Sequence, residues 1–410
     1  MVATASENIV VAGLDAMWLI LTAIGILLTQ VGFACIEGGH ARRKDQKTVL
    51  FKNLMDHSVA SSCWYFVGWR IFTGFNSTAI GEADFTYGRI LQQFGFEITT
   101  SSIVSACIIG RCRLNTYLCF SAYLAAFVYP VIAYVCWNPN GPLALFGYKD
   151  FGGGGVVHLL AGTCGLLGSH LCGKRYGVGT PSSGAAPLTA IGGLVLYISW
   201  FFVNAGSSGS ISTENAIRQA NRAALNTGLG AGAASLMGFI ICKLKKRLNL
   251  DFLVNSLISG LIINTAPCGF IEPPVAILLG LTAPWVVTSV SDLLAKMNVE
   301  DALDAIGVHG VCGFVGTIAV GLFHSTDGLL YSWEPRLLIA QVMACLVIIS
   351  WSCCTSLPFF SLFKYMDRLT YSENEQVAGL DHVYFGDYLG KDGEAGAYPE
   401  SLSKLESETR

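Results

Sequence analysis

Asp150-Phe151-Gly152-Gly153-Gly154-Gly155-Val156-Val157-His158 and Asp301-Ala302-Leu303-Asp304-Ala305-Ile306-Gly307-Val308-His309 each place an aspartate eight residues before a histidine. Eight residues of helix rise about 12 Å and turn through about 80°, so we expect each aspartate two turns from its histidine, on a neighbouring face. Glycine-rich segments follow at residues 162–168 and 310–316. They match best three residues out of register with the histidines, so the two stretches form an imperfect internal repeat.

The overall composition indicates a membrane protein. Of the 410 residues, 52% are hydrophobic and only 13% are charged, whereas a soluble domain has about 25% charged residues. The mean hydropathy is +0.53. The 46 glycines suit close packing between membrane helices. The net charge of −3 argues against a nucleic-acid partner, and most of the cysteines lie in apolar runs as small packing residues.

Eleven apolar runs are long enough to be predicted as membrane helices, each of which needs about 20 residues. Their centres lie near Gly25, Ser62, Ser102, Leu124, Gly165, Leu196, Ala233, Ile258, Leu281, Gly313 and Leu346. His158 falls in the fifth run and His309 in the tenth. Because five is odd, two five-helix halves run in opposite senses, as in inverted-repeat transporters, whose sites lie near the midplane between the halves. The predicted fold is therefore all-α integral membrane, with eleven transmembrane helices in an inverted five-helix pseudo-two-fold repeat and with His158 facing His309.

Loop charge predicts the orientation, because loops on the cytoplasmic side are rich in Lys and Arg. With the N-terminus outside, basic residues gather in the internal loops: Arg42, Arg43, Lys44, Lys47, Arg111, Arg113, Lys174, Arg175, Lys243, Lys245, Lys246, Arg247 and Lys296. We therefore expect a multi-pass protein with its N-terminus outside and its C-terminus in the cytosol. We place it in the plasma membrane. We expect residues 1–369 to form its eleven-helix transmembrane domain. Residues 370–410 form a polar cytosolic tail, whose composition is typical of disorder and whose regulatory partner is unknown.

The two histidines have three interpretations. A polar side chain is costly inside a membrane and therefore marks a pathway more often than it does elsewhere. Matching positions in a repeat favour pore-lining histidines further. A purely structural pair is the alternative. A metal site is disfavoured, because a zinc ion needs a third Cys, His or carboxylate ligand, so we expect no metal.

The motifs around the two histidines resemble those of the ammonium transporter/Rh family, and of its ammonium transporter branch in particular. Residues 150–158 resemble the family signature D-F-A-G-G-x-V-V-H, and residues 301–313 resemble the second signature. Trp200-Phe201-Phe202-Val203-Asn204-Ala205-Gly206-Ser207 is similar to W-F-G-F-N-A-G-S, and the basic turn from Gly38 to Lys44 resembles the turn after the first helix. The resemblance covers about residues 12–370. It implies eleven helices and a homotrimer with one pore in each subunit.

The resemblance also implies roles for individual residues. Those roles are an external ammonium recruitment site (Trp137, Ser207, Phe96), a buried acid below it (Asp150), its repeat-related acid (Asp301), an upper pore (Val203, Gln93) and the pore histidines (His158, His309). Three residues depart from the family pattern. Val203 replaces the second upper-pore phenylalanine, and Glu97 stands where a small residue is usual. Phe385 stands where the family tail often has a histidine.

These features predict transport of ammonium or ammonia. A tryptophan face attracts a cation, and neutral ammonia enters an apolar pore at a far lower cost than ammonium does. We therefore expect ammonium to lose a proton near the mouth before it passes the histidines. The alternatives are an ammonium sensor with little flux on the same scaffold, and an Rh-like transporter of another small amine or gas. The expected partners are ammonium or ammonia and membrane lipid. No catalytic set and no cofactor motif is present, so the sequence does not indicate an enzyme.

Overall fold

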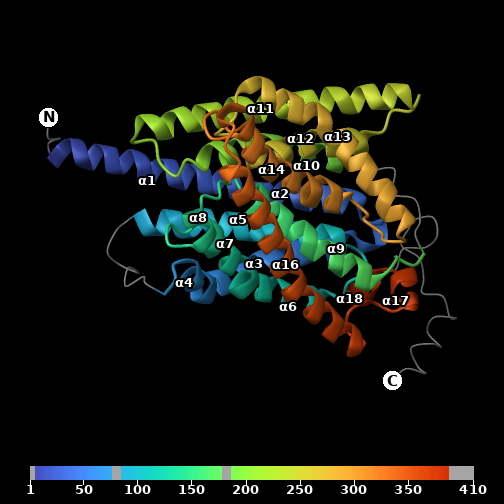
Figure 1. Ribbon diagram of the computed structural model, residues 1–410. Coiled ribbons are helices and arrows are strands. Elements are labelled where there is room, and N and C mark those ends of the chain that lie inside the picture. Colours follow the sequence, from blue (N-terminus) through green and yellow to red (C-terminus); the bar gives the residue numbers. More distant parts are fainter. Residues whose placement is uncertain (1–4, 76–84, 178–185, 387–410) are drawn as a thin grey trace.

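A computed structural model describes residues 5–75, 85–177 and 186–386. Within them the chain is helical, and the one β-bridge joins Cys112 to Thr370. Figure 1 shows the long helices packed side by side in one bundle, with α16 running obliquely across it. The helix α1 begins at one end of this bundle, called the N-terminal end below. The helices α17 and α18 lie at the opposite end, called the tail end.

The first half of the chain contains α1 (Ala5–Leu27), α2 (Thr29–His40), η1 (Arg43–Asp45), α3 (Gln46–Cys63), η2 (Trp64–Gly68), α4 (Trp69–Phe72), α5 (Phe85–Cys107), α6 (Leu114–Tyr123), η3 (Leu124–Val128), α7 (Tyr129–Trp137), α8 (Pro142–Phe146), η4 (Gly154–Leu159) and α9 (Leu160–Cys172). The second half contains α10 (Ala186–Gly206), α11 (Glu214–Leu244), α12 (Leu250–Thr265), α13 (Pro273–Lys296), η5 (Ile306–Val311), α14 (Cys312–Phe323), α15 (Leu329–Ser332), α16 (Arg336–Tyr365), α17 (Glu373–Ala378) and α18 (Leu380–Phe385).

Eight helices in the described ranges are long and apolar enough to cross a membrane. All eleven predicted centres lie within helical segments. The helix α12 is apolar but, with 16 residues, is too short to be one of these eight. The prediction of an all-helical membrane protein is therefore confirmed, and the count of eleven spans stays a prediction.

The outer surface of the bundle is apolar, and the polar side chains point inward. Leu54 and Leu225 are more than half exposed, whereas Asn226 and Gln341 are completely buried. Both buried amides donate hydrogen bonds to backbone carbonyls, Asn226 to Cys268 and Ile271 at 2.8 Å each and Gln341 to Lys149 at 2.7 Å. This distribution is what a bilayer requires of a helical protein, because lipid cannot satisfy polar groups.

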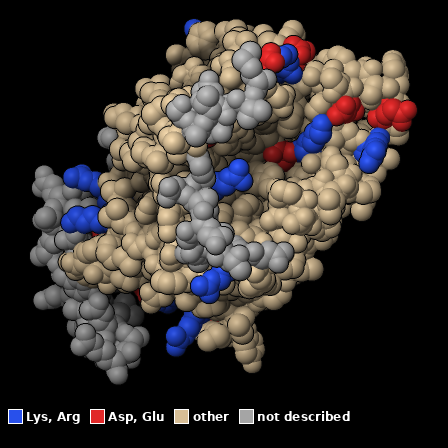
Figure 2. Space-filling view, turned by 90° about the vertical axis from the view of Figure 1, so that its left-hand side faces the viewer, with Lys and Arg blue, Asp and Glu red and all other residues tan. Residues whose placement is uncertain are grey.

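Figure 2 views the N-terminal end of the bundle. Lys and Arg, with a few Asp and Glu, lie scattered over a mostly uncharged surface. Two of the basic residues that we expected in internal loops are Arg42 and Arg113. Arg42 donates to the carbonyl of Tyr176, in the loop after α9, and Arg113 pairs with Glu375 of the tail.

The beginning of the tail is folded, which corrects the expectation of disorder for its first residues. The carboxylate of Asp381 accepts hydrogen bonds from the backbone N–H of Lys47 at 3.1 Å and of Thr48 at 2.7 Å, at the start of α3. In return, Asp45 accepts the backbone N–H of Leu380 at 2.8 Å. A carboxylate at a helix N-terminus satisfies donors that have no partner inside the helix. The tail therefore caps α3 from a distant part of the chain.

Replacing Asp381 with alanine is expected to detach the tail from α3. Loss of such a cap costs about 0.5–2 kcal/mol, so the tail should be cut faster by protease in detergent-solubilised protein. Limited proteolysis followed by mass spectrometry measures this rate. Glu373→Ala is the matched control, because Glu373 is exposed in the same tail. Equal cleavage rates of Asp381→Ala and the wild type would show that the cap does not hold the tail.

Candidate functional site

His158 and His309 lie against each other in the interior of the bundle. Their Nδ1 atoms are 3.1 Å apart, and the ring centroids are 5.2 Å apart at an interplanar angle of 17°. The side chains are 1% and 5% exposed. The predicted contact between the repeats is therefore confirmed. A hydrogen bond between two Nδ1 atoms needs one donor and one acceptor, so the pair holds a single hydrogen at this position.

Aromatic side chains fix the two imidazoles. The ring of Trp200 lies 5.5 Å from that of His158, and the Trp200 indole N–H donates to the hydroxyl of Thr265 at 2.9 Å. Phe33 lies 5.8 Å from His309. Sequence reasoning noted Trp200 within a motif but gave it no role. The packing shows that it orients His158.

The same helical irregularity carries both histidines. His158 lies in the π-helical turn η4 and His309 in the π-helical turn η5. Single π-turns inside α-helices are often found at functional sites. Each turn continues directly into an α-helix, α9 and α14 respectively. The internal repeat seen in the sequence is thus a repeat of local geometry.

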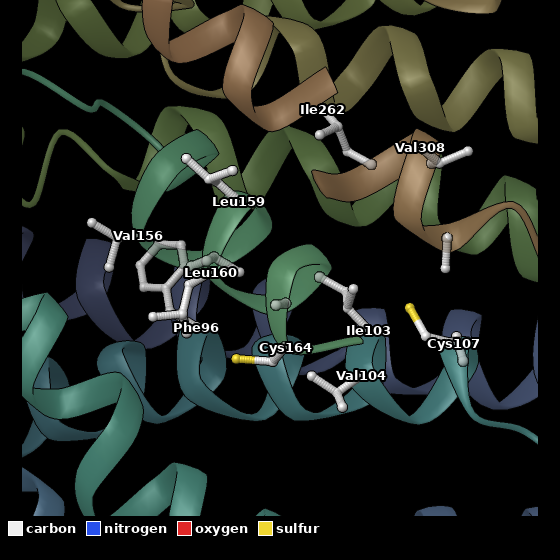
Figure 3. Close-up of a cluster of buried hydrophobic side chains, with 14 of the residues drawn as sticks. Phe96, Ile103, Val104, Cys107, Val156, Leu159, Leu160, Cys164, Ile262 and Val308 are labelled. Atoms are coloured by element: carbon white, nitrogen blue, oxygen red, sulfur yellow. The ribbon is translucent and has the colours of Figure 1, made fainter. Parts of the chain in front are cut away.

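Glycines allow the two histidine-bearing helices to meet at backbone distance. A Cβ at Gly162 would lie 2.2 Å from the Cα of Gly310, and one at Gly313 would lie 2.9 Å from the Cβ of His158. Any larger residue would therefore push the helices apart. Figure 3 shows the apolar side chains of η4 and α9, including Leu160 and Cys164, packed against Phe96 and Val104 of α5. The glycine segments that follow the histidines thus set the distance between the rings.

Asp150 does not lie on one helix two turns from His158, as the spacing alone predicted. Residues 150–153 are non-helical, and the carboxylate of Asp150 accepts four backbone N–H groups at the start of η4, those of Gly153, Gly154, Gly155 and Val156, at 2.8–3.0 Å. The hydroxyl of Tyr148 donates to the same carboxylate at 3.2 Å. Asp301 does the same in the second half, where it accepts from Ala305 at 3.0 Å and Ile306 at 2.7 Å. Both aspartates are therefore helix caps.

The residues predicted for ammonium recruitment are partly brought together. The rings of Phe96 and Trp137 are 5.4 Å apart. The indole N–H of Trp137 donates to the backbone carbonyl of Asp150 at 2.9 Å, so this ring is tied to the cap of η4. The hydroxyl of Ser207 turns back to the carbonyl of Val203 in its own helix, at 2.7 Å. Its place beside the two rings stays a prediction.

The two upper-pore residues lie on different helices. Val203 is 4% exposed on α10. Gln93 lies on α5 and accepts a hydrogen bond from the hydroxyl of Tyr129 at 3.1 Å. On the other side of the histidines, a small cavity beside His309 is lined mainly by apolar side chains, with Asn255 and Glu37 as its polar members. The pair therefore has open space on at least one side.

In the described part of the chain, no group of three His, Cys, Asp or Glu side chains could hold a metal ion. The imidazoles contact each other and aromatic rings. The arrangement suits a small polar solute that exchanges hydrogen bonds with imidazole.

Comparison with known proteins identifies the family. The model of the Ammonium Transporter Family matches residues 16–388. The chain belongs to this family. It is 31% identical to "Ammonium transporter 1 member 3" of Solanum lycopersicum, an alignment that covers 93% of this chain and 94% of that relative. Since the family consists of membrane transporters, this family member is a transporter and not an enzyme.

Solved structures of Amt and Mep2 proteins have the same fold. A structure described as "Sensor Amt Protein" superimposes with a TM-score of 0.84 at 25% identity, and covers 92% of this chain and 99% of that one. Mep2 of Candida albicans superimposes with a TM-score of 0.79 at 22% identity, and covers 88% and 87% of the two chains. The transporter fold predicted from the internal repeat is therefore confirmed.

Proposed function

We propose that this transporter moves ammonium, as ammonia plus a proton, through a pathway lined by His158 and His309. The observation that carries the proposal is the buried contact between the two imidazoles, with Nδ1 atoms 3.1 Å apart, in a chain of the ammonium transporter family. Buried polar side chains in membrane helices mark transport pathways. The pair gives a passing ammonia hydrogen-bond partners in an otherwise apolar interior.

Ammonium first binds beside Trp137 and Phe96. The indole face attracts a cation, and the hydroxyl of Ser207 accepts one of its N–H bonds once it turns toward the ring. Asp150 is not the proton acceptor, because its carboxylate already accepts four backbone N–H groups. It supports the site by holding η4 and, through its carbonyl, Trp137. Another group must therefore take the proton of ammonium.

Neutral ammonia then passes the histidines. Burial and the like charge of a neighbour both oppose a second proton on an imidazole pair. The pair therefore keeps a single hydrogen between the two rings and does not take up a second proton. Such a passage excludes hydrated metal ions, which would have to shed water without gaining ligands. Val203, which is smaller than phenylalanine, leaves a wider upper constriction.

Further features of the proposal come from the sequence and the family. The protein is placed in the plasma membrane with the N-terminus outside and the tail in the cytosol. The N-terminal end of the bundle is then the external end. The apolar outer surface contacts lipid, and the protein assembles as a homotrimer.

Reconstitution tests this function. Purified protein in liposomes receives an ammonium pulse, and the current and the internal pH are recorded against protein-free liposomes. We expect the protein to accelerate entry of ammonium or ammonia. Entry no faster than in protein-free liposomes would contradict transport and favour the sensor alternative. Faster entry of another small amine than of ammonium would favour the Rh-like alternative.

Replacing Trp137 with leucine is expected to weaken ammonium recruitment. Loss of a cation–π contact of about 0.5–2 kcal/mol raises the half-saturating ammonium concentration by roughly 2–30-fold. The concentration dependence of the ammonium-evoked current measures this. Trp333→Leu is a control, because Trp333 is 81% exposed. An unchanged half-saturating concentration for Trp137→Leu would assign the ring a structural role only.

A further inference from the structure

A row of polar residues follows one buried face of α5. Gln93, Glu97, Ser101 and Ser105 are spaced four residues apart, so their side chains share a face, about 6 Å apart along the axis. Glu97 and Ser105 are completely buried, and Ser101 is 1% exposed. A polar row of this length inside a membrane helix is costly, and such residues mark ion or proton pathways.

The first end of the row lies near the proposed recruitment site. Tyr129 donates its hydroxyl hydrogen to Gln93 at 3.1 Å. Gln93 lies one turn before Glu97 on α5. Phe96, whose ring lies 5.4 Å from that of Trp137, directly precedes Glu97 in the chain, so this end of the row starts beside the proposed recruitment site.

Two buried acids lie at the middle of the row, Glu97 within it and Asp56 beside it, and they differ in their hydrogen bonds. Asp56 of α3 is 1% exposed, and its carboxylate accepts from the hydroxyls of Ser101 at 2.9 Å and Tyr117 at 2.6 Å. Glu97 differs, because within the described residues neither of its carboxyl oxygens has a hydrogen-bond partner. Ser101, which binds Asp56, lies one turn after Glu97 on the same helix. An isolated carboxylate in such a place costs several kcal/mol, and a bound proton removes that cost.

The last part of the row reaches the cavity beside His309. Ser105 donates to the carboxylate of Glu37 at 2.9 and 3.0 Å, and the ammonium group of Lys52 lies 2.5 Å from the same carboxylate. Glu37 lines the small cavity that also contains His309. The row therefore begins near Trp137 on one side of the histidine pair and ends at the cavity on the other side.

The row and the side chains beside it have more carboxyl groups than positive charges. Glu37, Asp56 and Glu97 supply three carboxyl groups, whereas Lys52 supplies one ammonium group. The titratable groups that face the row from neighbouring helices are Glu37 (α2), Lys52, Asp56, His57 and Cys63 (α3), Tyr117 (α6) and Tyr129 (α7). A second cation is absent from this group, so an added proton lowers the electrostatic energy of the row.

We propose that Glu97, Asp56 and Glu37 form a proton path beside the histidine pair, so that ammonia passes the imidazoles while its proton goes around them. The inference rests on the proposed function. An N–H bond of ammonium breaks, its electron pair stays on nitrogen, and the proton reaches Glu97 through the hydroxyl of Tyr129 and bridging water. Glu97 passes a proton through bridging water to the carboxylate of Asp56, and protonated Asp56 passes one through water beside Ser105 to the carboxylate of Glu37. Glu37 releases this proton to ammonia in the cavity beside His309, so that each carboxyl group returns to its starting state. One positive charge crosses for each ammonium.

Glu97→Gln tests the path, because the amide keeps the size of the side chain and cannot relay a proton as a carboxyl does. In proteoliposomes given an ammonium pulse, we expect the current to fall by roughly tenfold or more, since a positioned proton-transfer group contributes at least that factor. Ammonia should still enter and, without its proton, should make the interior more alkaline than the wild-type protein does. Asp292→Asn is the matched control, because Asp292 is an exposed acid on α13 and its loss should leave both signals unchanged.

Two further variants keep the result decisive. Glu97→Asp retains a carboxyl group and should restore part of the current, which a purely structural glutamate would not require. Asp56→Asn should reproduce the loss of current and decides the matter if Glu97→Gln does not fold. Wild-type current in either neutral variant would overturn the proton path. Wild-type protein that alkalinises vesicles without any current would overturn the path and leave ammonia transport standing. Wild-type protein that gives neither signal would overturn the proposed function itself.

Discussion

Replacing His158 and His309 together with alanine is expected to lower the ammonium uptake of proteoliposomes and the accompanying current in parallel, by roughly tenfold or more. Ammonia that passes the pair exchanges hydrogen bonds with imidazole nitrogens. Each lost partner in a buried place costs about 1–3 kcal/mol, and about 1.4 kcal/mol in a barrier is a factor of ten in rate. The current falls with uptake because the proton leaves ammonium only as ammonia is drawn into the pore.

The parallel loss separates this variant from Glu97→Gln, which removes current and retains entry of ammonia. His170→Ala is the matched control, because His170 is an exposed histidine on α9, the helix that follows His158. The oligomeric state and the thermal midpoint of the double variant should be checked against the wild type in detergent. A folded double variant with wild-type uptake and current at every pH would show that the histidines only pack the interior.

The contact between the histidines could be predicted from the sequence because it depends on the repeat. Equal spacing from Asp150 to His158 and from Asp301 to His309 places the rings at equivalent points of two related halves. The structure adds the 3.1 Å separation and the ring of Trp200 over His158. The glycine at position 310 could be noticed in the sequence, but its partner, Gly162, is known only when the helices are packed.

The role of the aspartates could not be predicted from spacing, because a helix boundary was missing from the argument. The spacing rule assumes that residues 150–158 are all helical, whereas the helix begins at Gly154. Gly153 has a φ of 97°, a left-handed conformation that suits glycine, and it ends the irregular segment that brings Asp150 back to the first N–H groups. Similarly, the composition of the tail is typical of disorder, whereas Asp381 docks it on α3 through contacts more than 300 residues apart in the chain.

Glu97 shows a different limit of sequence reasoning. Its departure from the family pattern is visible in the sequence, but its surroundings are not. In the described residues the side chain is completely buried and neither carboxyl oxygen has a hydrogen-bond partner. Burial and the absence of partners depend on α3, α6 and α7, which lie apart in sequence from α5. Its importance therefore emerges only from packing.

Replacing Asp150 with alanine is expected to destabilise the transporter strongly and to abolish transport. Four backbone N–H groups, those of Gly153, Gly154, Gly155 and Val156, lose their acceptor. Buried donors without partners cost about 1–3 kcal/mol each, and some of them will find water, so a loss of several kcal/mol follows. Because η4 carries His158, two residues after Val156, the imidazole pair loses its alignment at the same time.

The number of acceptor oxygens predicts an order among variants, which a general loss of charge does not. Asp150→Asn keeps one acceptor oxygen and should lie between the wild type and Asp150→Ala in thermal midpoint, measured by fluorescence-detected gel filtration in detergent. Asp301→Ala removes the acceptor of two backbone N–H groups, those of Ala305 and Ile306, and should cost less than Asp150→Ala. Equal midpoints for wild type and Asp150→Ala would show that the cap does not stabilise η4. If Asp150→Asn had the thermal midpoint of the wild type but transported no ammonium, Asp150 would act on the proton of ammonium. The interpretation of Asp150 as a helix cap only would then be wrong.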